Sequence, residues 1–326
     1  MTPNGNTQKG RGLAAGLNPT GLLASFLLFL GTGLLSCAPV DEGGPAPSSS
    51  EAKATGDRGQ SEGFGAPGVF PIQLEDASGS FLVFHKPPSR VVSLVPSATQ
   101  TLLALESMGA LVGRTEYDTG SALAHLPSVG GGLEPSLETL VALAPDLVIR
   151  FAGESDLSTP ARLDDMGVTH MAIRLDRVDD VRALMEDLGT IMGRGDRARE
   201  LVTEMDATLL EIQRRVQGQP RVRVAYILGG NPPWVAGPGT FIDELLTTAG
   251  GENSFSDLTA LYGPVSPEEF LVRDIDLLLA PEGGEVLLSS TNIPLLRVSP
   301  AFELPGPDLA RAAWHLAELL HPEAFR

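Results

Sequence analysis

Sulfur and imidazole are scarce in this chain of 326 residues, and their scarcity limits how the protein can be built. Cys37 is the only cysteine, so no disulfide can form within the chain, and stability has to come from packing. The five histidines never occur in pairs at metal-ligand spacing, and the sequence has no cysteine-rich or histidine-rich cluster. We therefore expect no bare zinc or manganese site and no resident cofactor.

Positive charge is also in short supply. Lysine and arginine total 23 against 41 acidic residues, which gives a net charge of −18 and an isoelectric point near 4.6. Nucleic-acid phosphates and anionic lipid headgroups both select basic surfaces. The composition thus argues against a nucleic-acid partner and against electrostatic adhesion to a membrane.

The sequence shows no recognisable set of catalytic residues. Ser97 follows a predicted strand and precedes a predicted helix, as a hydrolase nucleophile would. Its surroundings read Val95-Pro96-Ser97-Ala98-Thr99, however, and lack the Gly-x-Ser-x-Gly elbow. We expect the protein not to be an enzyme.

The longest apolar run, residues 21–35, is shorter than the roughly 20 residues that a membrane-spanning helix needs. Its length and the cations before it are typical of a signal peptide, here residues 1–36. The run ends in Leu34-Leu35-Ser36-Cys37, which resembles a bacterial lipobox, and that resemblance implies that Cys37 becomes the acylated first residue of the mature protein. The alternative is a plain signal peptide with an incidental cysteine.

The remainder divides into four predicted segments. Residues 37–68 have almost no large apolar side chain and are predicted to be a flexible tether. Strands and helices then alternate, which is typical of an α/β fold with largely parallel sheets. Residues 69–177 are predicted to form an N-terminal lobe that opens with a hairpin, and residues 221–326 a C-terminal lobe. Between them, residues 178–220 are predicted to be connector helices, one of which (196–216) would extend about 30 Å.

Two stretches 130 positions apart follow one pattern. Ser136-Leu137-Glu138-Thr139-Leu140-Val141 precedes Asp146-Leu147-Val148-Ile149, and Ser266-Pro267-Glu268-Glu269-Phe270-Leu271 precedes Asp276-Leu277-Leu278-Leu279. Each stretch predicts a helix start, a short apolar helix with a glutamate in its first turn, and a buried strand. Such a repeat indicates two similar lobes, and two similar lobes suggest a cleft between them.

The ordered motifs carry a family resemblance over about residues 68–326. They are Pro96-Ser97-Ala98-Thr99, Ser136-Leu137-Glu138, Ala144-Pro145-Asp146-Leu147-Val148-Ile149, Asn231-Pro232-Pro233, the stretch 237–243 and Gly250-Gly251-Glu252-Asn253-Ser254-Phe255. In this order they resemble the substrate-binding proteins of the ABC importers for cobalamin, siderophores and haem, the helical-backbone metal receptors. The chain departs from that pattern between Pro281 and Pro300, where it is shorter, so a helix and part of an edge strand are expected to be missing.

The resemblance implies both a fold and partners. The fold would be two Rossmann-like lobes with a ligand cleft between them, joined by a long rigid α-helix. The protein would be an exported, lipid-anchored receptor in the periplasm or on the outer cell surface, acting as a monomer. It would deliver cobalamin or a related metal chelate to an ABC permease dimer with its ATPase.

Four of the scarce aromatic residues fall in predicted loops, two in each lobe: Tyr117, Phe151, Trp234 and Tyr262. Ligands of open α/β sheets bind beyond the carboxyl ends of strands, where these residues are predicted. Together they favour a cleft for a large flat ligand such as a corrin or porphyrin, although each of them alone is equally well explained by loop packing.

Three polar residues complete the predicted ligand site. Ser97 or Thr99 is expected to cap a helix over residues 101–108, whose amide groups would meet a polar group of the ligand. Asn231, beside Trp234, is assigned to the site through the resemblance.

Glu138 and Glu268 each have two explanations. A carboxylate in the first turn of a helix is stabilised by the helix dipole and needs no partner. In the family, the matching residues contact arginine pockets of the two permease subunits, and arginine suits this role because it binds carboxylates in a bidentate manner. Glu269 is a rival for the role of Glu268.

Two other functions remain open from the sequence. A siderophore or haem receptor of the same family would need several cations in the cleft, and the candidates are Arg114, Arg150 and Arg297. His125 would be an axial metal ligand in that case and a solvated loop residue otherwise. An anchored enzyme or a sensor without transport would need a reactive group in the cleft, which the sequence does not supply.

Overall fold

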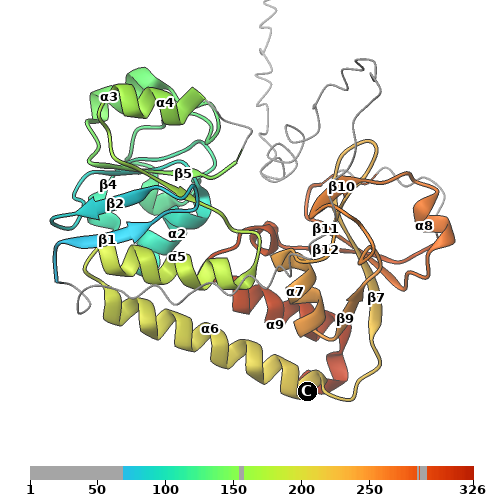
Figure 1. Cartoon of the computed structure of the whole chain (residues 1–326). Coiled ribbons are helices and arrows are strands. Elements are labelled where there is room, and N and C mark those ends of the chain that lie inside the picture. The colour runs from blue at the N-terminus through green and yellow to red at the C-terminus, as the bar shows by residue number, and fades with distance from the viewer. Residues whose placement is uncertain (1–68, 154–157, 285, 287–291) are drawn as a thin grey trace, which may run out of the picture.

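The computed structural model describes residues 69–153, 158–284, 286 and 292–326 (Figure 1). The predicted signal peptide, the predicted lipidation residue Cys37 and the predicted tether lie outside the described residues. Within the described part, no helix has both the length and the apolar character that crossing a bilayer requires.

The first sheet, in the part of the chain that we call lobe one, has four parallel strands in the order β4-β3-β5-β6. An antiparallel hairpin, β1 with β2, precedes it, as predicted. The elements of lobe one are β1 (Ile72–Glu75), β2 (Phe81–Phe84), β3 (Val91–Ser93), α2 (Pro96–Ala104), η2 (Met108–Ala110), β4 (Leu111–Gly113), η3 (Ser121–Leu123), α3 (Leu137–Leu143), β5 (Leu147–Phe151), α4 (Ser158–Asp165) and β6 (His170–Ile173).

The second sheet, in lobe two, has the order β10-β8-β7-β11-β12, and β9 pairs with the first half of the long strand β7. Its elements are β7 (Val222–Gly229), β8 (Trp234–Ala236), α7 (Phe241–Thr248), β9 (Gly251–Asn253), β10 (Tyr262–Pro264), α8 (Glu269–Val272), β11 (Leu277–Pro281), β12 (Leu295–Val298), η4 (Pro300–Glu303), α9 (Leu309–Leu320) and η5 (Pro322–Phe325). Strands β9, β7, β11 and β12 pair in parallel. Strand β8 pairs antiparallel with β7, and β10 pairs antiparallel with β8. The described residues between β11 and β12 form no helix.

The parallel strands of the two lobes are arranged alike. The order β4-β3-β5-β6 in lobe one corresponds to β9-β7-β11-β12 in lobe two. Leu147 in β5 lies opposite Val91 of β3, and Leu277 in β11, 130 positions later, lies opposite Val224 of β7. The sequence repeat is therefore a structural repeat.

An aspartate just before each repeated strand fixes it to its neighbour. In lobe one, Asp146 accepts a hydrogen bond from the amide of Arg90 at 2.9 Å, and its own amide donates to the Arg90 carbonyl at 2.8 Å. In lobe two, Asp276 accepts from the amide of Arg223 at 2.9 Å and donates to the Arg223 carbonyl at 2.9 Å. The same pair of bonds thus starts the strand pairing in both lobes.

Side chains along each central strand alternate between two cores, because successive residues of a strand point to opposite faces of the sheet. Val148 and Leu278 pack into separate outer cores, one in each lobe, while Ile149 and Leu279 face a larger inner core. The inner core is one cluster that includes residues of both sheets and of α2, α7 and α9. Helices α3 and α4 lie on the outer side of the first sheet and α2 and α5 on the inner side (Figure 1).

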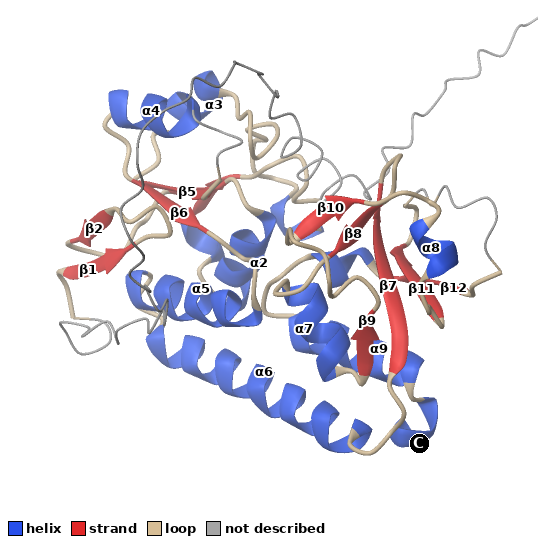
Figure 2. Ribbon diagram, turned by 45° about the vertical axis from the view of Figure 1, so that its right-hand side comes forward, coloured by secondary structure: helices blue, strands red, loops and turns tan. Residues whose placement is uncertain are grey.

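The connector consists of α5 (Val178–Ile191) and α6 (Gly195–Val216). The two helices approach so closely that a Cβ atom on Gly189 would lie 2.3 Å from the Cβ of Ala198. Helix α6 contacts α5 at one end and α9 at the other, and it runs beneath both lobes (Figure 2). The α/β fold with its long joining helix is as predicted.

Two local predictions were wrong. Helix α2 begins at Pro96, not near residue 101, and its N-cap Val95 provides no side-chain hydrogen bond, so neither Ser97 nor Thr99 caps it. Proline suits the first position of a helix because its missing N–H would be unpaired there in any case. Three aromatics expected in loops lie in strands: Trp234 and Tyr262 are the first residues of β8 and β10, and Phe151 is the last residue of β5.

Candidate functional site

The loop after β6 joins lobe one to the start of α7 in lobe two. The amide of Phe241 donates to the carbonyl of Asp176 at 2.5 Å. Glu244 accepts a hydrogen bond from the amide of Val178 at 2.8 Å and forms an ion pair with Arg177 at 2.7 Å. The segment after the carboxyl end of β6 therefore contacts lobe two through hydrogen bonds and an ion pair, and we call this contact the junction of the lobes.

Tyr262, a predicted ligand residue, lies at this junction. Burial raises the pKa of its phenol well above the usual range, and the charges of Asp176 and Glu303 raise it further. Asp176 follows β6 of lobe one, and Glu303 follows β12 of lobe two. The phenol is thus within electrostatic range of an acid from each lobe.

Glu303 was not anticipated from the sequence. Burial raises the pKa of its carboxyl to about 8, and the hydrogen bond that Tyr226 donates to it at 3.1 Å opposes that rise. The Tyr226 ring is fully buried, 5.2 Å from the ring of Phe302. The Glu303 carboxyl is accordingly mostly protonated at pH 7. The sequence signal that could have indicated a buried Glu303 is that this acid lies between the apolar residues Phe302 and Leu304, just beyond the last strand.

The two predicted aromatics of lobe one follow β4 and end β5. Tyr117 is half-buried; burial raises the pKa of its phenol, and Glu116 adds to the rise. Phe151 is the last residue of β5 and packs against the edge of the inner core. Both lie at carboxyl ends of parallel strands, where the sequence placed them.

Ser97 and Thr99 are 3% and 1% exposed, so this conformation leaves them almost no surface for a ligand. The hydroxyl of Thr99 is near enough to Asp118 to lower the pKa of that carboxyl, although burial raises it overall. Among the described residues, Thr99 Oγ1, Asp118 Oδ1 and Arg114 Nε are buried without a hydrogen-bond partner. Thr99 and Arg114 both interact with the buried carboxyl of Asp118, so the three side chains lie near one another.

Asn231 and Trp234 lie at the turn between β7 and β8. Asn231 is exposed, and Trp234 is half-buried against the inner core. A Cβ atom on Gly230, whose φ is +89°, would lie 3.0 Å from Cδ1 of Trp234. This glycine therefore lets the chain turn tightly beside the indole.

Each of the three predicted cleft arginines already donates to protein acceptors. Arg150 is buried and donates to His170 at 3.1 Å, and Arg114 donates to the carbonyl of Thr115 at 2.9 Å. Arg297 binds the carbonyls of Pro281 and Gly284 at 2.9 and 2.6 Å.

One further cation lies at the junction. Arg174, which the sequence analysis did not name, is exposed at the carboxyl end of β6, and its Nε is 3.9 Å from Asp176. Arg174 could have been predicted as a site residue, because it directly follows a predicted strand.

Metal-binding side chains do not gather in the described part of the chain. It contains no group of three or more His, Cys, Asp or Glu residues that could hold a metal ion. His125 is exposed in the segment between β4 and α3. Its role as an axial ligand remains a prediction.

Glu138 and Glu268 are both exposed, on α3 and at the N-cap of α8. Helix α8 begins only at Glu269, so Glu268 is its N-cap and precedes the first turn, in which it was expected to lie. Hydrogen bonds from its own backbone and from Ser266 lower the pKa of Glu268. Glu269 instead forms an ion pair with Arg273 at 3.0 Å, which leaves Glu268 as the more available acid.

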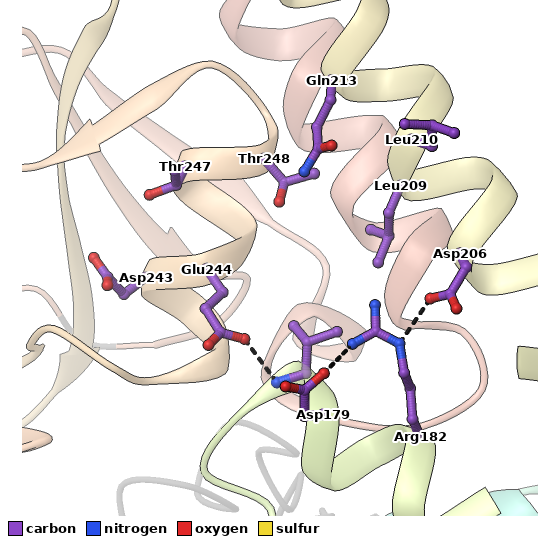
Figure 3. Close-up of a pocket in the computed structure, with 11 residues that line it drawn as sticks. Asp179, Arg182, Asp206, Leu209, Leu210, Gln213, Asp243, Glu244, Thr247 and Thr248 are labelled. Atoms are coloured by element: carbon purple, nitrogen blue, oxygen red, sulfur yellow. Dashed lines mark hydrogen bonds and ion pairs between the residues drawn. The ribbon is translucent and has the colours of Figure 1, made fainter. Parts of the chain in front are cut away.

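A pocket of about 560 Å³ opens between α5, α6 and α7, next to the contact of Val178 with Glu244 at the junction (Figure 3). None of the predicted ligand residues lines it. Its Arg182 pairs with Asp179 and with Asp206, and its Glu244 holds the amide of Val178. Arg182 and Glu244, charged groups of this pocket, thus have partners within the protein.

Comparisons with known proteins place the chain among solute receptors. A family model described as periplasmic binding protein matches residues 91–286. A cobalamin-binding protein of Halobacterium salinarum is 32% identical over 218 residues, covering 64% of this chain; the chain spans only 58% of that protein's length. An uncharacterised ABC transporter substrate-binding lipoprotein of Bacillus subtilis is 25% identical over 279 residues, covering 79% of this chain and 88% of that protein.

A solved structure shows the same fold. A periplasmic haem-binding protein of Pseudomonas aeruginosa superposes with a TM-score of 0.64 and 24% identity, covering 72% of this chain and 93% of that one. The two-lobed architecture inferred from the sequence is therefore confirmed.

Proposed function

The chain belongs to the periplasmic binding protein family, and from that membership we propose that it is the lipid-anchored receptor of an ABC importer for cobalamin or a related metal chelate. The halobacterial relative is named a cobalamin-binding protein, which supports the ligand class. The name of the Bacillus relative supports both the importer and the anchor, which would be attached at Cys37 and hold the exported protein at a membrane.

The observation that carries the proposal is the placement of four aromatic residues. Tyr117 and Phe151 come from lobe one, and Trp234 and Tyr262 come from lobe two. A flat macrocycle held between the lobes would stack on rings from both sides. Asn231, exposed beside Trp234, would contribute a polar contact.

The charges near the junction favour a neutral, amide-bearing chelate over an anionic one. Arg150 and Arg297 donate to protein acceptors, and Arg114 donates to the Thr115 carbonyl while its unpaired Nε is buried away from any ligand. The second candidate is a haem or siderophore receptor, and the exposed Arg174 favours it because it could meet a ligand carboxylate. A sensor or an anchored enzyme has no such supporting observation.

Ligand titration tests the proposal. The full chain is titrated with cyanocobalamin, haemin and a ferric hydroxamate, and the tightest binding is expected for cyanocobalamin. Trp234→Ala should weaken that binding roughly tenfold through loss of stacking. Trp314→Ala is the matched control. It removes an indole of α9 that packs under Arg215 of α6, and it should leave cyanocobalamin binding unchanged. Binding of none of the three ligands would overturn the proposal.

A further inference from the structure

The 130-residue repeat extends to which side chains are buried on the two short helices. Leu140 of α3 and Phe270 of α8 occupy equivalent positions, and both are fully buried in the outer core of their lobe. The next residues, Val141 and Leu271, are 57% and 58% exposed. Each helix thus has one side chain buried in the core, Leu140 or Phe270, which we call its core anchor. An exposed aliphatic side chain follows it directly.

The anchors hold these outward residues in place. The ring of Phe270 lies 5.2 Å from that of Phe255, over which the guanidinium of Arg273 sits at 4.6 Å. Leu140 packs with Val148 and Leu163 in the outer core of lobe one. Because the anchors cannot turn outward without emptying a core, the exposure of Val141 and Leu271 is built into the fold.

Each outward aliphatic residue lies three positions after an exposed glutamate. Glu138 precedes Val141, and Glu268 precedes Leu271. Single exposed aliphatic residues are common on protein surfaces and need no explanation. Here the same acid and aliphatic pair recurs at equivalent places in both lobes, and in lobe two the neighbouring Val272 is 80% exposed as well.

We propose that Val141 and Leu271 are the apolar half of a two-point docking surface for the importer's permease dimer. This proposal rests on the proposed function, because that function supplies the partner. A surface that occurs twice in one chain fits a partner made of two copies of one subunit. Each copy would present a cation to the glutamate and an apolar rim to the aliphatic residue beside it.

The apolar contact gives the ion pair strength that it lacks alone. An exposed ion pair contributes little because water and salt screen it. Packing of Val141 or Leu271 against the partner would exclude water next to the carboxylate and strengthen the charge interaction. The aliphatic residues would therefore govern dissociation, whereas the glutamates would govern orientation and the rate of association.

Replacement by glutamine tests this, because glutamine keeps the length of the side chain and favours helix. The full chain carrying Val141→Gln, Leu271→Gln or both is measured for binding to the permease–ATPase complex of the same cell, held in lipid nanodiscs. Each single change should weaken binding about tenfold, and the double change about a hundredfold. Leu319→Gln on α9, where the leucine is 45% exposed, is the matched control and should leave binding unchanged.

Two parallel measurements separate the possible failures. Cyanocobalamin affinity should stay unchanged in all four variants; if the unaltered chain binds no chelate, the proposed function fails instead. If Glu138→Ala and Glu268→Ala abolish docking while the glutamine variants dock normally, the aliphatic residues have no role and this inference is overturned. An effect of only one of the two single changes would also overturn it, because docking would then use one lobe.

Discussion

The hydroxyl of Tyr226 donates a hydrogen bond of 3.1 Å to the carboxyl of Glu303, and both side chains are buried where the lobes meet. Tyr226 comes from the central strand β7 and Glu303 from the turn after the last strand. The pair brings a titratable group into the interior of a protein that has an excess of acids on its surface.

This carboxyl should make stability fall as the pH rises. Burial raises its folded pKa to about 8 from an ordinary 4.5, so the folded state binds one more proton than the unfolded state between these values. The contribution is fully present below pH 4.5 and is lost as the pH rises through 8, with an amplitude on the order of a few kcal/mol. Melting temperatures measured from pH 5 to 8 should therefore decline more steeply for the unaltered chain than for Glu303→Gln. Parallel curves for the two proteins would contradict this.

The two strand-starting aspartates should contribute similarly to stability. Asp276→Ala leaves the amide of Arg223 without its acceptor, and Asp146→Ala leaves the amides of Ser89 and Arg90 without theirs, at a cost of about 1–2 kcal/mol for each variant in urea unfolding. Asp274 is the matched control, because it pairs with the same Arg223 at 3.1 Å through its side chain and is mostly exposed. Asp274→Ala should change the unfolding free energy by less than about 0.5 kcal/mol. Equal losses at positions 274 and 276 would show that the ion pair alone matters.

Acid should weaken the same contact in lobe two. The hydrogen bonds from Arg223 lower the pKa of Asp276 to about 2, below its ordinary 3.8. A group with a lowered folded pKa stabilises the protein above its unfolded pKa, and that stabilisation is lost as the pH falls from about 4 to 2. The unfolding free energies of the unaltered chain and of Asp276→Asn should converge over this range. A constant difference between them down to pH 2 would rule out this linkage.

Gly189 should tolerate no side chain at all. In an isolated helix, glycine to alanine is stabilising by about 1 kcal/mol. Here the new methyl group would overlap the Cβ of Ala198, so α5 and α6 would have to separate and Gly189→Ala should lower the unfolding free energy instead. Chemical denaturation measures the sign directly, and a gain in stability would contradict the close packing.

Uptake measurements can distinguish Glu138 and Glu268, the glutamates proposed for docking, from the neighbouring Glu269. Glu138→Ala and Glu268→Ala should each reduce uptake of labelled cyanocobalamin without changing ligand affinity, because the proposed cation pockets of the permease would lose their partner. Glu269→Ala should have little effect on uptake, because Glu269 is committed to Arg273. A loss of ligand affinity in the Glu138 or Glu268 variant would place that residue in the ligand site instead.

The sequence predicted the repeated parts well because their signals are local. A serine, a short apolar helix and an apolar strand follow one another within 20 residues, and the structure places α3 with β5 and α8 with β11 accordingly. The antiparallel strands β8 and β10 were missed. The pairing of β10 with β8 joins residues such as Tyr262 and Ala236, 26 positions apart, and no local pattern reports it.

The site was less predictable than the fold. Carboxyl ends of strands could be read from the sequence, and so Tyr117, Phe151 and Tyr262 were placed near them. The burial of Ser97 and Thr99 could not, because it depends on how α2 packs in the finished lobe. Glu303 became notable only when its partner Tyr226, 77 positions earlier, was brought beside it.

The inner core belongs to both lobes at once, and this fixes the spacing between the tips that carry Glu138 and Glu268. A receptor with independently moving halves would have to order them when it meets a partner. In this protein the shared core already holds the two tips at one spacing, so under the proposed docking the second tip would be in position for its own contact once the first had bound. That second contact would be an intramolecular step with a high effective concentration, and two weak contacts would act as one strong one.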